Sequence, residues 1–106
     1  MKTKGREQLM GVRFNREYRD IVRDMGHALG QIDNCYESFA MERADWEELD
    51  REEQIEYMCT LADDIFYGLG AEPTIEIGEG KVQYDSVNHV IRIWTDAQVV
   101  HLVKLV

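Results

Sequence analysis

The stretch REEQIEYMCTLADDIFYGL, residues 51–69, decides the fold of this 106-residue chain. Its apolar side chains are separated by gaps of three and one, which is the spacing of one face of a helix with 3.6 residues per turn. These residues are Ile55, Met58, Cys59, Ala62, Ile65, Phe66 and Leu69. The opposite side carries Glu52, Glu53, Glu56, Asp63 and Asp64. The stretch therefore predicts a helix with one face in a core and the other facing water or a cationic partner.

A second helix is predicted upstream, over residues 16–40, with Asn15 as its N-cap. Apolar residues alternate with gaps of four and three along a seam made of Tyr18, Val22, Met25, Leu29, Ile32, Tyr36 and Phe39. Ile21, Ala28 and Cys35 widen this seam to the breadth of a helix packed in a globular core. Gly26 and Gly30 lie one turn apart beside it, where we weigh a close approach of another backbone, a bend or a ligand pocket.

The segments around these helices are less regular. In residues 1–14, the apolar Met10, Val12 and Phe14 alternate with other residues, which indicates an extended arm or an extra edge strand. In the linker 41–50, Asp45 with Glu48 and Asp50 with Glu53 have the spacing of a capping box. We therefore expect a short helical turn over residues 46–49 and the main helix from residue 51. Trp46 is expected to pack over the end of the helix pair, with an exposed contact role as the alternative.

After Pro73 the composition becomes typical of strands. The stretches are TIEI (74–77), KVQY (81–84), HVIRIW (89–94) and VVHLVKLV (99–106). Short turn-like joints between them favour antiparallel neighbours. The sequence thus predicts a single α+β domain over residues 1–106: a two-helix antiparallel hairpin packed on one face of a C-terminal antiparallel meander of three or four strands, residues 74–106.

Both faces of this predicted sheet carry apolar residues, although helices cover only one face. Val90 and Trp94 alternate with Ile91 and Ile93, and Val100 and Leu102 alternate with Val99, Val103 and Leu105. Either the N-terminal segment covers the second face, or that face or an exposed edge pairs with another subunit as a homo-oligomer.

Charge is distributed unevenly along the chain, whose net charge is −9. Residues 24–80 contain sixteen acidic residues against Arg43 and Arg51. This acidic middle disfavours direct binding of nucleic acid, whose phosphates it would repel, and favours basic protein surfaces as partners. No secretory signal and no apolar membrane-spanning stretch are found, so we expect a cytoplasmic protein with no membrane contact. Cys35 and Cys59 fit two reduced core thiols, with a disulfide as the alternative.

No catalytic, metal-binding or cofactor-binding motif emerges. The three histidines, His27, His89 and His101, are widely scattered, and no phosphate-cradling loop or nucleophile motif is present. Glu53 and Glu56, with Glu17 and Asp20, have the spacing of magnesium-binding carboxylates on helices, but their order and neighbours do not match a known pattern. We therefore assign no family, no catalytic residue, no metal site and no cofactor.

The most prominent feature outside the core is the acidic run of residues 45–56. A solvated helix face explains many such runs, and pairing of Arg16, Arg19 and Arg23 with Asp63 and Asp64 is also expected if the helices are antiparallel. As partner-binding residues we predict Asp45, Trp46, Glu47, Glu48, Glu52, Glu53 and Glu56.

The function expected from this surface is a non-enzymatic acidic protein-binding module. It would be a small intracellular regulator or inhibitor, of the phage or mobile-element type, that docks on a basic partner surface such as that of a nucleic-acid-handling protein. The alternative is a small homodimeric Mg/nucleotide-binding protein or hydrolase that uses the helix carboxylates.

Overall fold

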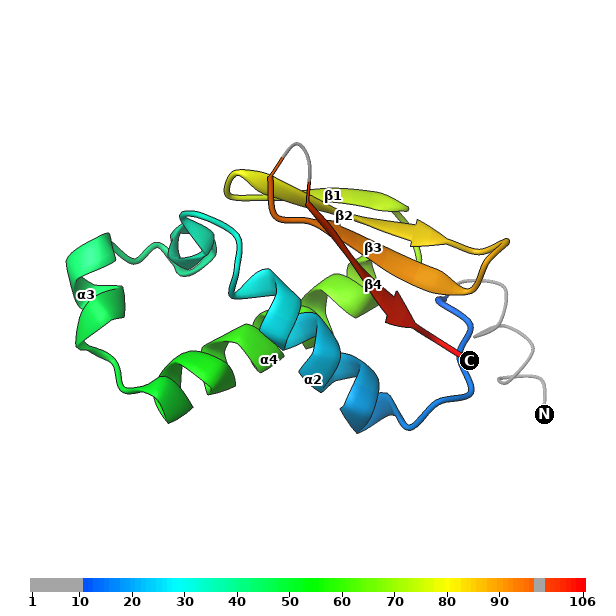
Figure 1. The fold of residues 1–106 in the computed structure, drawn as a ribbon, viewed down its shortest axis with the longest axis horizontal. Coiled ribbons are helices and arrows are strands. Elements are labelled where there is room, and N and C mark those ends of the chain that lie inside the picture. The colour runs from blue at the N-terminus through cyan, green and yellow to red at the C-terminus, as the bar shows by residue number, and fades with distance from the viewer. Residues whose placement is uncertain (1–10, 97–98) are drawn as a thin grey trace.

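The fold is α+β, with the helices preceding a four-stranded antiparallel sheet (Figure 1). The structure, a computed structural model, describes residues 11–96 and 99–106. In chain order the elements are α2 (Tyr18–Leu29), a 3-10 segment η1 (Cys35–Phe39), α3 (Arg43–Glu48), α4 (Arg51–Gly68), β1 (Thr74–Ile77), β2 (Gly80–Asp85), β3 (Val90–Trp94) and β4 (Val100–Lys104). The predicted order of helices followed by strands is confirmed.

The strands form a meander in the order β1-β2-β3-β4, each antiparallel to the next. The register places Val82 opposite both Ile75 and Ile93, and Ile91 opposite Val103. Because side chains alternate between the two faces of a strand, these residues share one face. That inner face is the one covered by α2 and α4 (Figure 1).

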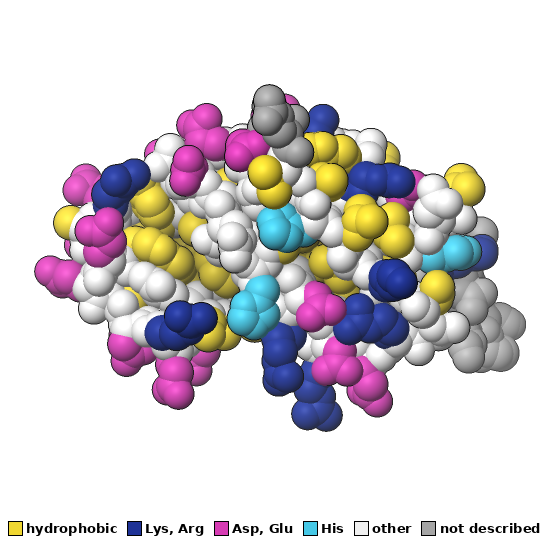
Figure 2. Space-filling view, viewed as in Figure 1, with side chains coloured by type: hydrophobic (Ala, Val, Ile, Leu, Met, Phe, Trp, Pro, Cys, Tyr) yellow, Lys and Arg dark blue, Asp and Glu magenta, His cyan; other side chains and the backbone are white. Residues whose placement is uncertain are grey.

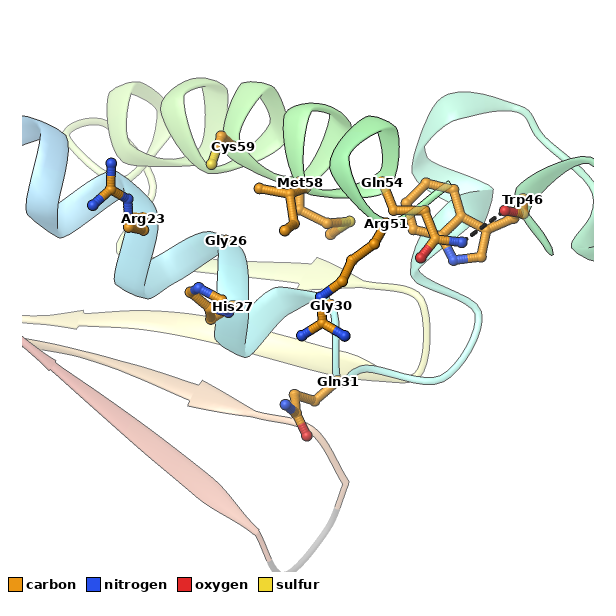
Figure 3. A pocket seen from close by; sticks show the side chains of 11 residues that line it. Arg23, Gly26, His27, Gly30, Gln31, Trp46, Arg51, Gln54, Met58 and Cys59 are labelled. Carbon is orange, nitrogen blue, oxygen red and sulfur yellow. Dashed lines mark hydrogen bonds between the residues drawn. The ribbon is translucent and has the colours of Figure 1, made fainter. Parts of the chain in front are cut away.

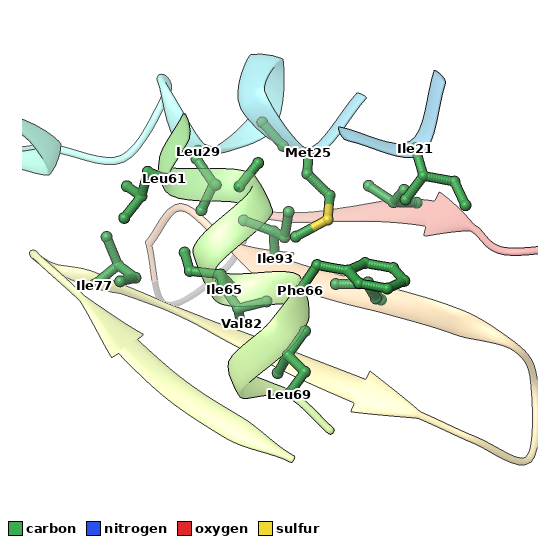
Figure 4. Close-up of a cluster of buried hydrophobic side chains, with 14 of the residues drawn as sticks. Ile21, Met25, Leu29, Leu61, Ile65, Phe66, Leu69, Ile77, Val82 and Ile93 are labelled. Carbon is green, nitrogen blue, oxygen red and sulfur yellow. The ribbon is translucent and has the colours of Figure 1, made fainter. Parts of the chain in front are cut away.

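The core lies between this face and the two long helices. Side chains of α2, α4 and three strands point toward one another there (Figure 4). Those that are almost fully enclosed include Ile21, Met25, Leu29, Leu69, Val82, Ile91, Ile93 and Leu105. Along α4 the buried stripe differs from the predicted one, since Leu61 is buried, Ile55 is 38% exposed and Cys59 is half-buried. The stripe is centred further toward Leu61 because Ile55 and Cys59 face a pocket between α2 and α4.

The single long helix predicted over residues 16–40 is wrong. Helix α2 ends at Leu29, and the chain then turns and continues as the 3-10 segment η1, whose flanking residues Asn34 and Ala40 have left-handed backbone angles. Ile32 and Cys35 are nevertheless buried. Their helix-like spacing therefore reflects burial in the core and not a continuous helix. The expected two-helix hairpin is not confirmed in that form, because the described residues contain three α-helices.

The predicted N-cap at Asn15 is also wrong. Helix α2 has Glu17 at its N-cap without a side-chain capping bond, and the backbone N–H of Asn15 instead donates to the carbonyl of Leu105 at 2.9 Å. This bond ties the chain before α2 to the residue that follows β4.

Residues 11–14 form no strand and pack on the helical side of the sheet. Val12 is buried in the core, and the ring of Phe14 lies 5.4 Å from that of Phe66. The part of the predicted arm or edge strand in residues 1–10 lies outside the described residues. On the outer face and edge of the sheet, Val100 and Leu102 are 43% and 59% exposed.

Candidate functional site

The candidate site is built on α3 and the first turns of α4. Helix α4 begins with the predicted capping box: the backbone N–H of Glu53 donates to Asp50 Oδ1 at 2.8 Å, and the backbone N–H of Asp50 donates to Glu53 Oε1 at 3.0 Å. This satisfies two backbone donors and fixes the first turn. Glu53 is therefore engaged within the helix, whereas the sequence suggested a carboxylate available to a partner.

The predicted capping role of Asp45 is wrong. Helix α3 begins at Arg43, with Glu42 at the N-cap and no side-chain capping bond, so Asp45 lies inside the first turn. The helix spans six residues rather than the single turn expected over residues 46–49. This places the carboxylate of Asp45 on the exposed side of α3.

Five carboxylates of this region, called here the acidic surface, are exposed: Asp45, Glu47, Glu48, Glu52 and Glu56. Among the described residues, none of these side chains has an ion-pair or hydrogen-bond partner. Acidic side chains gather at the end of the molecule formed by α3 and the start of α4 (Figure 2). Five of the six carboxylates predicted for partner binding are thus exposed on α3 and the start of α4 without an ion pair, although Arg43 interacts electrostatically with Glu47.

An aromatic cluster lies beneath the acidic surface and holds α3 in place. The ring of Trp46 stacks on Phe39, with centroids 6.1 Å apart and planes 14° apart, and it meets Tyr57 of α4 edge-on at 6.2 Å. Tyr36 lies on another side at 6.5 Å. The amide of Gln54 also donates to the carbonyl of Trp46 at 2.7 Å. Trp46 is half-buried and packs as predicted, while Tyr57 was not singled out from the sequence.

The arginines in and just before α2 are arranged differently from the prediction. Arg16, which precedes α2, pairs with Asp24 of that helix at 2.9 Å, and no ion pair joins Arg19 or Arg23 to α4 among the described residues. The residue of α2 that reaches Asp63 is Tyr18, whose hydroxyl donates to that carboxylate. Burial, together with this bond, raises the pKa of Tyr18 far above its usual range. The predicted pairing failed because Tyr18 occupies the position facing Asp63.

The carboxylates considered for a magnesium site are separated in space. Glu53 and Glu56 lie at the start of α4, and Asp63 lies about 15 Å from the first and about 10 Å from the second along the helix, at 1.5 Å per residue. The Tyr18–Asp63 contact places the start of α2, with Glu17 and Asp20, beside the far end of α4. In residues 11–96 and 99–106, no group of three or more His, Cys, Asp or Glu side chains is arranged to hold a metal ion.

Both cysteines are free thiols. Cys35 is buried, and this burial raises the pKa of its thiol. Cys59 is half-buried and faces α2, where a Cβ atom placed on Gly26 would lie 3.3 Å from its sulfur and 3.5 Å from its backbone nitrogen. The close backbone approach predicted at Gly26 is therefore confirmed.

Comparison of the chain with protein-family models, with curated proteins and with solved structures finds no match. Within the part of the chain that the structure describes, no helix is both long and apolar enough to cross a membrane. Function must therefore be argued from the site itself.

Proposed function

We propose that this protein is a non-enzymatic binding module whose acidic surface docks on a basic surface of a partner protein. The observation that carries the proposal is the group of five exposed carboxylates on α3 and the start of α4, none of which forms an ion pair among the described residues, together with the half-buried Trp46 of α3. A row of carboxylates fixed on two helices presents negative charge in a defined geometry. Such a row can occupy a cationic groove that otherwise holds phosphates, which favours a nucleic-acid-handling protein as the partner.

Like charges on the acidic surface repel one another before any partner binds. Glu48 and Glu52 flank the junction between α3 and α4, and Glu52 and Glu56 are four residues apart on α4, where side chains are neighbours. A like-charge pair at this spacing destabilises a helix by about 0.2–0.5 kcal/mol. A cationic partner would relieve this repulsion. The relief would make the free energy of binding more favourable.

Trp46 supplies an apolar anchor beside the charges. Tryptophan is enriched among the residues that dominate interface energies, because its large ring excludes water from neighbouring contacts. Since Trp46 is half-buried and already held by Phe39 and Tyr57, little side-chain freedom would be lost when a partner covers its exposed part.

The proposal is tested by affinity capture with two variants of equal net charge. In the site variant, Glu47, Glu48 and Glu52 become Gln; in the control variant, three exposed acids elsewhere are neutralised, as Asp64→Asn, Glu72→Gln and Glu76→Gln. We expect the wild type and the control to retain the same basic protein in low salt, and the site variant to lose it. Retention should also weaken as salt rises. Equal retention by both variants would contradict the proposal.

A second proposal concerns self-association through β4. This strand is at an edge of the sheet, and within the described residues no strand pairs with its free side. Val99, Val100 and Leu102 are 45%, 43% and 59% exposed, and an apolar exposed edge is a template for pairing with a second copy. Light scattering should give a dimer that Leu102→Lys converts to a monomer. A wild-type monomer at high concentration would refute it.

A further inference from the structure

A pocket of about 190 Å³ lies between α2 and the first half of α4, and Trp46 of α3 forms part of its wall. Besides the Cys59 thiol, the ionisable side chains that line it are basic: Arg23 and His27 come from α2, and Arg51 is the first residue of α4. No described Asp or Glu lines it. The chain has a net charge of −9, whereas the two charged side chains that line this pocket, Arg23 and Arg51, are both positive.

The two arginines of this pocket have no intramolecular ionic partner. Neither Arg23 nor Arg51 makes an ion pair or hydrogen bond with the described residues. Asp24, which is next to Arg23 in sequence, is already paired with Arg16, and Arg51 is flanked by Asp50, which caps α4, and by Glu52. Figure 3 shows Arg51 reaching from the start of α4 across to the end of α2, where its guanidinium lies beside Gly30 and near His27 and Gln31. Donors from two helices thus meet at one end of the pocket.

Gly30 forms part of the pocket wall, and its backbone conformation does not require glycine. Its φ of −66° and ψ of −13° are right-handed angles that any residue adopts, and a Cβ atom there would meet nothing closer than 3.4 Å. With right-handed angles, glycine gains nothing over alanine at this C-cap and loses more conformational freedom on folding. Gly30 instead leaves space beside the Arg51 guanidinium, at the position where a side chain would narrow the pocket.

We propose that this pocket binds the phosphate group of a small molecule. A phosphate offers several acceptor oxygens, which suits donors that converge from different directions, and guanidinium groups bind it through paired hydrogen bonds. The volume equals about six waters at roughly 30 Å³ each, which admits a phosphate but not a drug-sized ligand. Ile55 and Met58 line the same pocket and would contact the carbon atoms attached to the phosphate.

Titration of the whole chain with inorganic phosphate and with glycerol 3-phosphate tests this site. Binding is followed by calorimetry and by amide chemical shifts at constant ionic strength. The variants are Arg51→Gln and the matched control Arg19→Gln, which removes the same charge from an exposed position of α2 outside the pocket. We expect the Arg51 variant to weaken binding at least about tenfold, and the control to change it less than about twofold. Shifts should centre on Gly26, His27 and Gly30.

The two ligands distinguish free phosphate from an organic phosphate. Tighter binding of glycerol 3-phosphate would identify a phosphate monoester as the ligand, and equal binding would identify inorganic phosphate. Because the side chain of Arg51 makes no contact with an ionic partner among the described residues, the variant should keep the wild-type melting temperature without phosphate. If the two variants weaken binding equally, if the shifts spread along α2, or if neither ligand binds at millimolar concentration, the proposal is overturned.

Discussion

Replacing Trp46 by alanine should detach α3 from the rest of the domain. The Trp46 ring is the only side chain of α3 in aromatic contact with both η1 and α4 among the described residues, through Phe39 and Tyr57. Removal leaves a gap between these rings. The carboxylates of the acidic surface that belong to α3 would then no longer be held in place.

The magnitude follows from the burial of the ring. A fully buried Trp→Ala change costs about 3–5 kcal/mol, and each aromatic pair contributes about 0.5–1.5 kcal/mol beyond area burial. Trp46 is half-buried and has three ring partners, so we expect the free energy of unfolding to fall by about 2 kcal/mol. For a domain of this size that corresponds to a drop in melting temperature of roughly 10 °C.

Thermal and urea unfolding, followed by circular dichroism, measure this change. Trp46→Phe retains a stacked ring on Phe39 and should lose less than half as much stability. Tyr67→Ala, at a site that is 85% exposed, should change the unfolding free energy by less than about 0.5 kcal/mol. If Trp46→Ala is as mild as Tyr67→Ala, the aromatic cluster does not hold α3, and the reasoning is refuted.

Three further substitutions test the fold. Gly80→Ala would place a Cβ atom 2.2 Å from a backbone carbonyl of β3, and urea melts should show a loss at the upper end of overpacking effects, about 3 kcal/mol or more; a neutral result would contradict the sheet geometry. Asp50→Ala removes the α4 cap and should cost about 1 kcal/mol at neutral pH, whereas an unchanged melting temperature would show that the cap is not formed in solution. Hydrogen bonds from Asn88 and Arg92 hold the pKa of Asp85 well below its usual range, so its stabilisation is present above about pH 4 and is lost as the pH falls toward the lowered pKa. The stability difference between wild type and Asp85→Asn should therefore shrink below pH 4, and a constant difference from pH 7 to 2 would refute this assignment.

The helix–sheet order and the core could be predicted because burial follows periodicity. Met25 and Leu29 on α2 and Ile91 and Ile93 on β3 are each fully buried, as their spacing indicated. The capping box at Asp50 was likewise readable, since it depends on residues only three apart.

The break after Leu29 was not predictable from the same rule. Apolar residues at positions 32 and 35 keep the helical spacing, yet they enter the core from a turn and a 3-10 segment. The left-handed angles at Asn34 and Ala40 flank the 3-10 segment, and alanine gives little sequence indication of such an angle.

The site was predicted in part for a similar reason. The acidic run identified exposed carboxylates from local composition, but the contacts that position them join Trp46 to Phe39 and Tyr57 across the fold. The basic pocket combines Arg23 and Arg51 from two helices that are far apart in sequence. The only local indication of that pocket in the sequence was the pair of glycines, Gly26 in α2 and Gly30 at its C-cap.

The most direct measurement of the central claim is the affinity of the captured basic partner for three forms of the protein, determined by titration calorimetry in one buffer. The form lacking the charges of Glu47, Glu48 and Glu52 should bind at least about tenfold more weakly than wild type, since it loses several charged contacts. The form neutralised at Asp64, Glu72 and Glu76 should bind within about twofold of wild type, because the exposed charges it loses lie outside the interface. Similar affinities for the two altered forms would mean that net charge, and not the surface formed by α3 and α4, attracts the partner.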